Sequence, residues 1–191
     1  YLVNFEYMGQ DMRTVDIDCG QFVNLLTRGR IEGHKVDDKS EPLENAVFGL
    51  FRTDCTEYAA GNALMTAVSD ENGYFEFGNI PYGEYVVREI KAPTGYILSN
   101  KSYLVSISED GDVIEITAEN KPITVKISKR DIYGNELKGA KMQIIDSEGN
   151  IVDEWTSDGT DHIVTKIPVG NYTLKEIAAP DGYVIATDIK F

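Results

Sequence analysis

The sequence is 191 residues long and 42% hydrophobic, which provides for one large or two small cores. Its 18 basic and 32 acidic residues give a net charge of −14, so it would repel nucleic acid and anionic membranes, and neither is expected as a partner. No apolar run is long enough to span a bilayer, and both ends fall within strand-like sequence, so we expect a piece of a longer protein.

Residues 1–29 are predicted to be the C-terminal strands of a preceding, truncated domain. The Tyr-Leu-Val at 1–3 matches the Tyr-Leu-Val at 103–105, and each is followed by an alternating run and then by an asparagine, Asn24 or Asn120. The tail therefore has the pattern of a domain end whose front is missing.

Residues 30–121 are predicted to form one complete all-β unit. Short alternating runs are separated by turn sequences such as Asp-Glu-Asn-Gly at 70–73 and Glu-Asp-Gly at 109–111. No helical period is evident, although the alanine-rich segment 55–68 has room for one short helix. Several short strands of this kind predict a β-sandwich.

Residues 122–191 are predicted to be a second β-sandwich that lacks its last strand or strands. Its turns are Ser-Glu-Gly-Asn at 147–150 and Ser-Asp-Gly at 157–159. The linker at 120–122 is short, so we expect the two units to stack with little freedom.

An internal repeat relates the two units. Residues 81–96 and 168–183 share their proline, glycine, tyrosine, glutamate, Ala-Pro and Gly-Tyr positions at an offset of 87. Upstream, Lys35 corresponds to Lys129 at an offset of 94, so the first copy carries seven extra residues, which we expect in a loop around 54–63.

Polar residues interrupt the apolar faces of the predicted strands. In a strand, alternate residues share a face, and this rule puts Lys35, Glu89 and Asn120 on the inward side of the first unit. Lys129 and Glu176 hold the same positions in the second unit. Buried lysine and glutamate are rare unless paired, and leaving either charged and alone would cost several kcal/mol.

Two arrangements would resolve this cost, and the pattern leaves both open. The first is a buried Lys–Glu ion pair with the asparagine as a hydrogen-bond partner. The second is covalent. Burial lowers the pKa of lysine and raises that of glutamate, so the neutral amine becomes a nucleophile. The protonated glutamate would donate to the amide oxygen and pass protons to the leaving ammonia, giving a Lys–Asn isopeptide bond whose rate comes from holding the reactants together.

The repeated motif resembles a known family. Tyr-x-x-x-Glu-x-x-Ala-Pro-x-Gly-Tyr at 85–96, with its twin at 172–183, resembles the E-box of Gram-positive pilins and adhesins. The Lys-Val-Asp at 35–37 is similar to the opening strand of the same domains. The resemblance is to the Cna-B or SpaA-like, prealbumin-like repeats of cell-wall-anchored surface proteins, and it covers nearly all of residues 30–191.

This resemblance implies tandem Ig-like or prealbumin-like β-sandwiches with intramolecular isopeptide bonds. By position, the first unit would link Lys35 to Asn120 with Glu89 as the catalytic residue. The second unit would supply Lys129 and the catalytic Glu176, with its asparagine past residue 191.

The resemblance also implies a function. We expect a structural stalk or spacer of an adhesin or pilin, outside the cell and anchored to a Gram-positive cell wall. Its partners would be the neighbouring domains of its own polypeptide, and it would need no cofactor and act on no outside substrate. The alternative is an adhesive module that recognises a host extracellular-matrix protein or glycan, which a large apolar patch on the insertion at 55–64 would favour. Asn24 of the tail is a further, unpaired cross-link candidate.

Weaker signals point to no other chemistry. Cys19 and Cys55 fall in segments assigned to different domains, so a disulfide framework is not expected, and the Cys-Gly-Gln at 19–21 favours a free thiol over a thioester. His34 and His162 are more than a domain apart, so no metal site is predicted. The Asp-rich turns lack an EF-hand spacing and read as solvated turns.

Overall fold

A computed structural model describes residues 24–191 of the chain. The tail strands predicted from residue 1 to 23, with Cys19 and its thioester alternative, lie outside the described residues. Within residues 24–191, no helix has both the length and the apolar character needed to cross a membrane.

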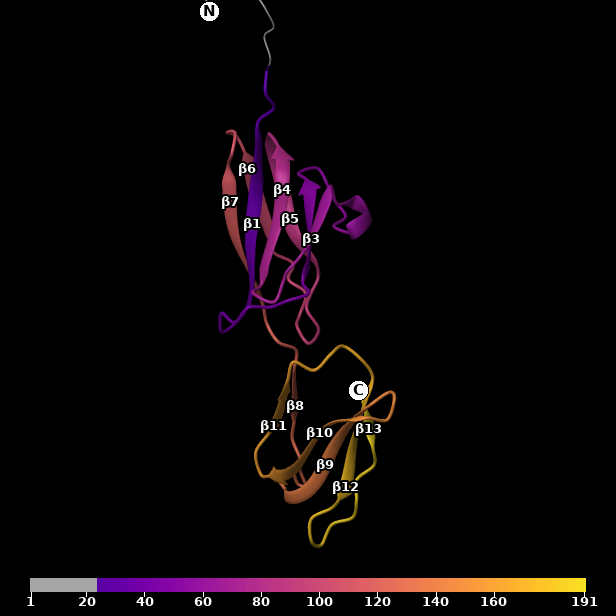
Figure 1. Cartoon of the computed structure of the whole chain (residues 1–191). Coiled ribbons are helices and arrows are strands. Elements are labelled where there is room, and N and C mark those ends of the chain that lie inside the picture. Colours follow the sequence, from indigo (N-terminus) through magenta and orange to yellow (C-terminus); the bar gives the residue numbers. More distant parts are fainter. Residues whose placement is uncertain (1–23) are drawn as a thin grey trace, which may run out of the picture.

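The first half of the chain is a β-sandwich. Its strands are β1 (Arg28–Asp37), β2 (Val47–Arg52), β3 (Met65–Val68), β4 (Tyr74–Pro81), β5 (Gly83–Lys91), β6 (Ser102–Ile107) and β7 (Val113–Asn120). They form one sheet in the order β4-β1-β7 and a second in the order β3-β2-β5-β6 (Figure 1). The core lies between these sheets, and Phe48 of β2 stacks on Phe75 of β4 with ring centroids 3.9 Å apart.

The first and last strands of this sandwich are neighbours. β1 pairs with β7 in parallel over its last eight residues, and Lys35 lies opposite Ala118 and Asp37 opposite Asn120. On its other side β1 pairs antiparallel with β4. β1 is therefore hydrogen-bonded along both edges, and every second residue of it points into the core. Lys35 lies on this inward face together with Ile31 and Gly33.

A tight turn fixes the part of β1 that carries Lys35. The Asp70 carboxylate accepts hydrogen bonds from the backbone N–H groups of Asn72 (2.9 Å) and Tyr74 (2.8 Å). Gly73 has φ 73°, a left-handed conformation that favours glycine. The Gly73 carbonyl accepts from the Lys35 N–H at 2.7 Å, and an added Cβ would lie 2.2 Å from the Lys35 carbonyl oxygen, so only glycine fits.

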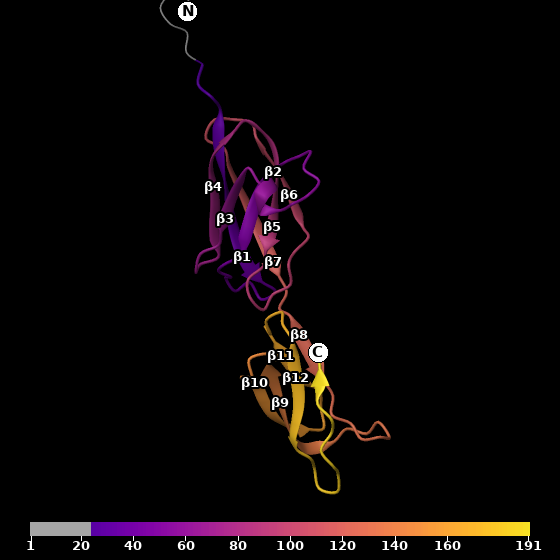
Figure 2. The same cartoon turned by 90° about the vertical axis from the view of Figure 1, so that its right-hand side faces the viewer.

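The second half of the chain repeats part of this plan. Its strands are β8 (Thr124–Ile127), β9 (Lys138–Asp146), β10 (Ile151–Asp158), β11 (His162–Thr165), β12 (Tyr172–Ala178) and β13 (Ile189–Lys190). One sheet has the order β10-β9-β12-β13, and β11 pairs with β8. Its core of buried residues, around Ile127, Ile144, Ile167 and Tyr172, is smaller than that of the first half. The two halves lie end to end (Figure 2).

The all-β sandwich fold predicted from the sequence is confirmed, with two differences of detail. β1 begins at Arg28, two residues inside the segment predicted to belong to the tail. The alanine-rich segment contains a single 3₁₀ turn, η1 (Ala60–Asn62), and then the edge strand β3.

Gly33 is required by packing rather than by backbone conformation. A Cβ at this position would meet the Phe75 ring at 2.1 Å. The ring cannot move away easily, because Phe75 is 2% exposed and stacked on Phe48.

We therefore expect Gly33→Ala to lower the free energy of unfolding by about 1–3 kcal/mol, the usual cost of overfilling a packed core. Urea denaturation measures this loss. Gly61→Ala is the matched control, because a Cβ at Gly61 meets nothing within 4 Å. Equal urea midpoints for the two variants would contradict this packing.

Candidate cross-linking site

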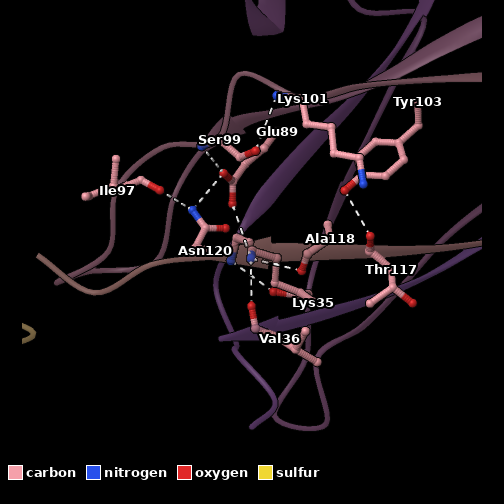
Figure 3. A network of polar contacts seen from close by, with 12 residues as sticks. Lys35, Val36, Glu89, Ile97, Ser99, Lys101, Tyr103, Thr117, Ala118 and Asn120 are labelled. Carbon is pink, nitrogen blue, oxygen red and sulfur yellow. Dashed lines mark hydrogen bonds and ion pairs between the residues drawn. The ribbon is translucent and has the colours of Figure 1, made fainter. Parts of the chain in front are cut away.

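Three polar side chains from three strands meet inside the first sandwich. Lys35 comes from β1, Glu89 from β5 and Asn120 from β7 (Figure 3). Their exposed fractions are 0%, 5% and 2%. Burial on the inward face, which the alternation predicts for all three, is therefore what the structure has.

Lys35 is held by backbone oxygens. Its Nζ donates to the carbonyl oxygens of Val36 and Ala118, each at 3.1 Å. The nearest carboxylate oxygen, Oε1 of Glu89, is 4.0 Å away, which is too far for a hydrogen bond. Desolvation by the core lowers the pKa of Lys35 from 10.5 to about 8, even though the Glu89 charge opposes the shift.

Glu89 uses its two oxygens differently. Oε2 accepts from the backbone N–H of Ser99 at 2.8 Å and from Nδ2 of Asn120 at 2.9 Å. Oε1, on the side of Lys35, has no hydrogen-bond partner. Burial raises the pKa of Glu89, while the two hydrogen bonds and the nearby amine partly offset that rise.

Asn120 is oriented by its nitrogen. Nδ2 donates to Oε2 of Glu89 and to the carbonyl oxygen of Ile97. The amide oxygen Oδ1 is buried without a hydrogen-bond partner. An unpaired buried acceptor costs about 1–3 kcal/mol. The hydrogen bond from Glu89 to this oxygen, predicted from the sequence, is absent, because Glu89 contacts the amide nitrogen instead.

The carboxyl of Glu89 thus lies between an amine and an amide. One oxygen faces the amine of Lys35, and the other holds the amide nitrogen of Asn120. A carboxyl in this place can take a proton from one nitrogen and return a proton to the other. With no direct Lys–Glu hydrogen bond, the contact is weaker than the tight ion pair that would make two buried charges stable.

A similar pair is present in the second half. Nζ of Lys129 lies 3.4 Å from Oε1 of Glu176, and their side chains are 18% and 1% exposed. Oε2 of Glu176 accepts from the backbone N–H of Ala186 at 2.5 Å, as Glu89 does from Ser99. The cavity beside this pair has no asparagine among its lining residues within the described part of the chain.

The other candidates are not brought to either pair. Asn24 is exposed and precedes β1. Cys55 is a free thiol whose Sγ donates to the Glu57 carbonyl at 3.3 Å. From residue 24 onward, no three His, Cys, Asp or Glu side chains converge as a metal site would need. Asp37 uses its carboxylate on its own turn, where it accepts from two backbone N–H groups.

Sequence reasoning missed the backbone partners of the site. The Ile97 carbonyl and the Ser99 N–H have no signature in residue type, because any residue at position 97 carries the carbonyl and any residue but proline at position 99 carries the N–H. Only the recurrence of the Ala-Pro-x-Gly-Tyr motif at a fixed distance after Glu89 and Glu176 marks the loop that supplies them.

Comparison with known proteins places both units in one family. The family model of the SpaA prealbumin-like fold domain matches residues 29–122 and again 123–191. The trypsin-resistant surface T6 protein of Streptococcus pyogenes is 31% identical over 134 residues, 65% of this chain and 24% of that protein. Serine-aspartate repeat-containing protein E of Staphylococcus aureus is 26% identical over 179 residues, 77% of this chain and 14% of that protein.

Solved structures are also similar over most of the chain. The TIE protein of Bacillus anthracis has 28% sequence identity and a TM-score of 0.53, and the match covers 86% of this chain and 31% of that one. The chain thus spans less than a third of each of these proteins, with 24% and 14% of the two curated relatives.

The lowered pKa of Lys35 can be tested in a variant that cannot form a Lys35–Asn120 bond. Asn120→Ala removes the amide with which Lys35 would react. Burial lowers the pKa of the folded Lys35 amine from 10.5 to about 8, and Asn120 is not among the causes of this shift, so we expect the shift to persist in the variant. The unfolded state binds more protons between these values, so the free energy of unfolding should rise from pH 8 to pH 10.

We expect this rise to be roughly 1–3 kcal/mol relative to a Lys35→Met/Asn120→Ala chain, measured by urea denaturation at each pH. Comparison with the double variant cancels the titration of the groups that do not interact with Lys35. Parallel pH profiles for the two chains would show that Lys35 titrates normally.

Proposed function

Since this chain belongs to the family of SpaA prealbumin-like fold domains, we propose that it is a stalk segment of a bacterial surface protein in which a Lys35–Asn120 isopeptide bond braces the first unit. The family supports a structural, surface-exposed module rather than an enzyme that acts on outside substrates. The proposed location is extracellular, on a Gram-positive cell wall, and the proposed partners are neighbouring domains of the same polypeptide.

One observation carries the proposed bond. A nucleophile, an acid and an amide are buried together in the first sandwich, and Glu89 lies against both of the others. A set built only for stability would place the charges in direct hydrogen-bonded contact, and it would not leave Oε1 of Glu89 and Oδ1 of Asn120 unpaired in the core.

The proposed reaction is an intramolecular transamidation. The neutral Nζ of Lys35 attacks Cγ of Asn120, so the new C–Nζ bond forms and the C–Nδ2 bond breaks. Glu89 accepts one proton from Nζ and delivers one proton to Nδ2, which leaves as ammonia. Glu89 ends in the protonation state in which it began. The reaction needs no cofactor, and its rate comes from the fixed positions of the reactants.

The bond would act on stability and on mechanical load. It closes a loop of 85 positions from Lys35 to Asn120, which by analogy with a disulfide of that loop length removes about 4–5 kcal/mol of unfolded-state entropy. The bond would also keep the 85 positions between the two residues from extending when the chain is pulled. At about 3.3–3.6 Å per residue, this shortens the fully stretched chain by about 290 Å. Because β1 and β7 are the first and last strands of the unit, a pulling force would pass through the covalent link.

The same scheme extends to the second unit. We propose residues 30–121 and 122–191 as the two units, with β1 extending the first back to Arg28. Lys129 and Glu176 would be the amine and acid of the second bond, whose asparagine would lie on a strand corresponding to β7.

The insertion at 55–64 is only partly engaged by its own unit, because Leu64 at its end is 45% exposed. It folds back on its own unit, where the Tyr58 ring meets the Phe51 ring edge to face at 5.0 Å. The guanidinium of Arg88 lies 4.4 Å from the centre of the same ring. The aromatic side chain of the insertion is therefore engaged within the unit.

Intact-mass measurement of the purified, denatured chain tests the bond. We expect the wild-type chain to weigh less than its sequence by one molecule of ammonia. The full sequence mass should return in Lys35→Met, in Glu89→Ala and in Asn120→Ala, because each removes one reactant or the acid.

Lys129→Met is the matched control, since it removes the corresponding lysine of the second unit and should keep the deficit. A folded wild-type chain that has its full sequence mass would refute the cross-link. The remaining explanation would be that Lys35 and Glu89 form a buried ion pair.

A further inference from the structure

One loop of the first unit touches both the candidate cross-linking site and the second unit. This docking loop, residues 92–99, follows β5 and contains the Ala-Pro-x-Gly-Tyr motif. On its inner side the Ser99 N–H donates to Glu89, and the Ile97 carbonyl accepts from Asn120 (Figure 3). The position of the loop therefore sets the position of the acid and of the amide.

On its outer side the docking loop is bound by the linker at 120–122 and by the start of the second unit. The Gly95 carbonyl accepts from the Ile123 N–H at 2.8 Å, and the Ile97 N–H donates to the Lys121 carbonyl at 2.9 Å. Tyr96 forms a β-bridge with Pro122 and is only 8% exposed. The loop is thus fixed by backbone contacts on both sides.

Lys166 of the second unit contacts the same loop. It has φ 62°, unusual for a residue with a side chain, and its N–H donates to the Ile123 carbonyl at 2.8 Å. Its carbonyl oxygen would lie 2.4 Å from a Cβ at Gly95, so glycine allows the two backbones to approach. Its Nζ lies 5.4 Å from the centre of the Tyr96 ring.

The same lysine also contacts β1. Nζ of Lys166 is 3.8 Å from Oδ2 of Asp37, whose side chain is 4% exposed. Two backbone N–H groups hold the pKa of Asp37 below its usual value, so this carboxylate is charged at neutral pH. Asp37 lies two residues after Lys35 and opposite Asn120 in the parallel pair. Lys166 therefore contacts both the strand of the amine and the loop that holds the amide.

The second unit provides an internal comparison. Its corresponding loop at 179–186 has no unit docked on it among the described residues. There Tyr183 is 48% exposed, whereas Tyr96 is 8% exposed. A Cβ at Gly182 would meet nothing within 4 Å, although its φ of 86° matches the 83° of Gly95. The close packing around Gly95 and Tyr96 is therefore a property of docking and not of the motif.

We propose that the second unit positions the cross-linking site of the first, with Lys166 as its main positioning residue. The inference rests on the proposed function, because it concerns the rate of the same bond. When the second unit docks, the Ile97 carbonyl fixes the amide of Asn120 and the Ser99 N–H fixes the carboxyl of Glu89. Small displacements of reacting groups reduce rates strongly, so an undocked loop should slow the reaction.

The test follows ammonia loss over time. The whole chain is made by cell-free translation, translation is stopped, and samples are denatured in acid at intervals for intact-mass measurement. We expect Gly95→Ala to slow the loss roughly tenfold, because its Cβ displaces the Lys166 backbone. Gly182→Ala is the matched control with the same backbone strain and should react at the wild-type rate.

Lys166 variants separate its side chain from its backbone. Lys166→Gly keeps the left-handed conformation and removes the amine, and we expect the reaction to slow about three- to tenfold. Lys166→Arg should restore most of the rate, because arginine also pairs with a carboxylate and an aromatic ring. Lys126→Ala, which removes a lysine paired with Asp161 inside the second unit, should change nothing.

The outcomes separate this inference from the proposed function. Equal rates in wild type, Gly95→Ala and Lys166→Gly would overturn the inference while leaving the bond in place. A wild-type chain that never loses ammonia would overturn both. Far-ultraviolet circular dichroism of each variant identifies chains that do not fold. If Gly95→Ala does not fold, the rate of Lys166→Gly tests the inference. The Lys166 side chain is 56% exposed, so its removal leaves both cores intact.

Discussion

The amine of Lys35 lies in an apolar interior without a carboxylate in hydrogen-bond contact, and the rest of the first unit is arranged around that fact. The core keeps water from it, the backbone carbonyls of Val36 and Ala118 accept its hydrogen bonds, and Glu89 lies just beyond hydrogen-bond distance. In water such an amine would stay charged and unreactive. Burial lowers its pKa and raises that of Glu89, and both shifts favour the neutral pair that nucleophilic attack requires.

Strand topology would give the proposed Lys35–Asn120 bond a mechanical role. The parallel pairing of β1 with β7 brings together residues that are 85 positions apart and places the amide beside the amine. A bond between neighbouring strands in sequence would close a short loop and withhold little extension. A bond between the first and last strands spans the whole unit, and the end-to-end stacking of units then gives a segment suited to a surface stalk (Figure 1).

Much of this could be predicted from the sequence, because period-2 alternation and an internal repeat are both properties of residue type. They predicted the fold and the inward faces of Lys35, Glu89 and Asn120. Three features could not be read in that way. The Ile97 carbonyl is a backbone group, the approach of Lys166 to Gly95 joins two units, and the need for glycine at position 33 depends on where the Phe75 ring lies. Each depends on tertiary contacts between segments far apart in the chain.

Tryptic digestion of the denatured wild-type chain, followed by tandem mass spectrometry, tests the central claim most directly. Trypsin cannot cleave after a lysine whose amine is in an amide bond. A branched peptide that joins residues 31–39 to residues 102–126 is therefore expected, with the junction at Lys35 and Asn120. Cleavage after Lys35, with residues 102–126 recovered as an unmodified linear peptide, would contradict the covalent link.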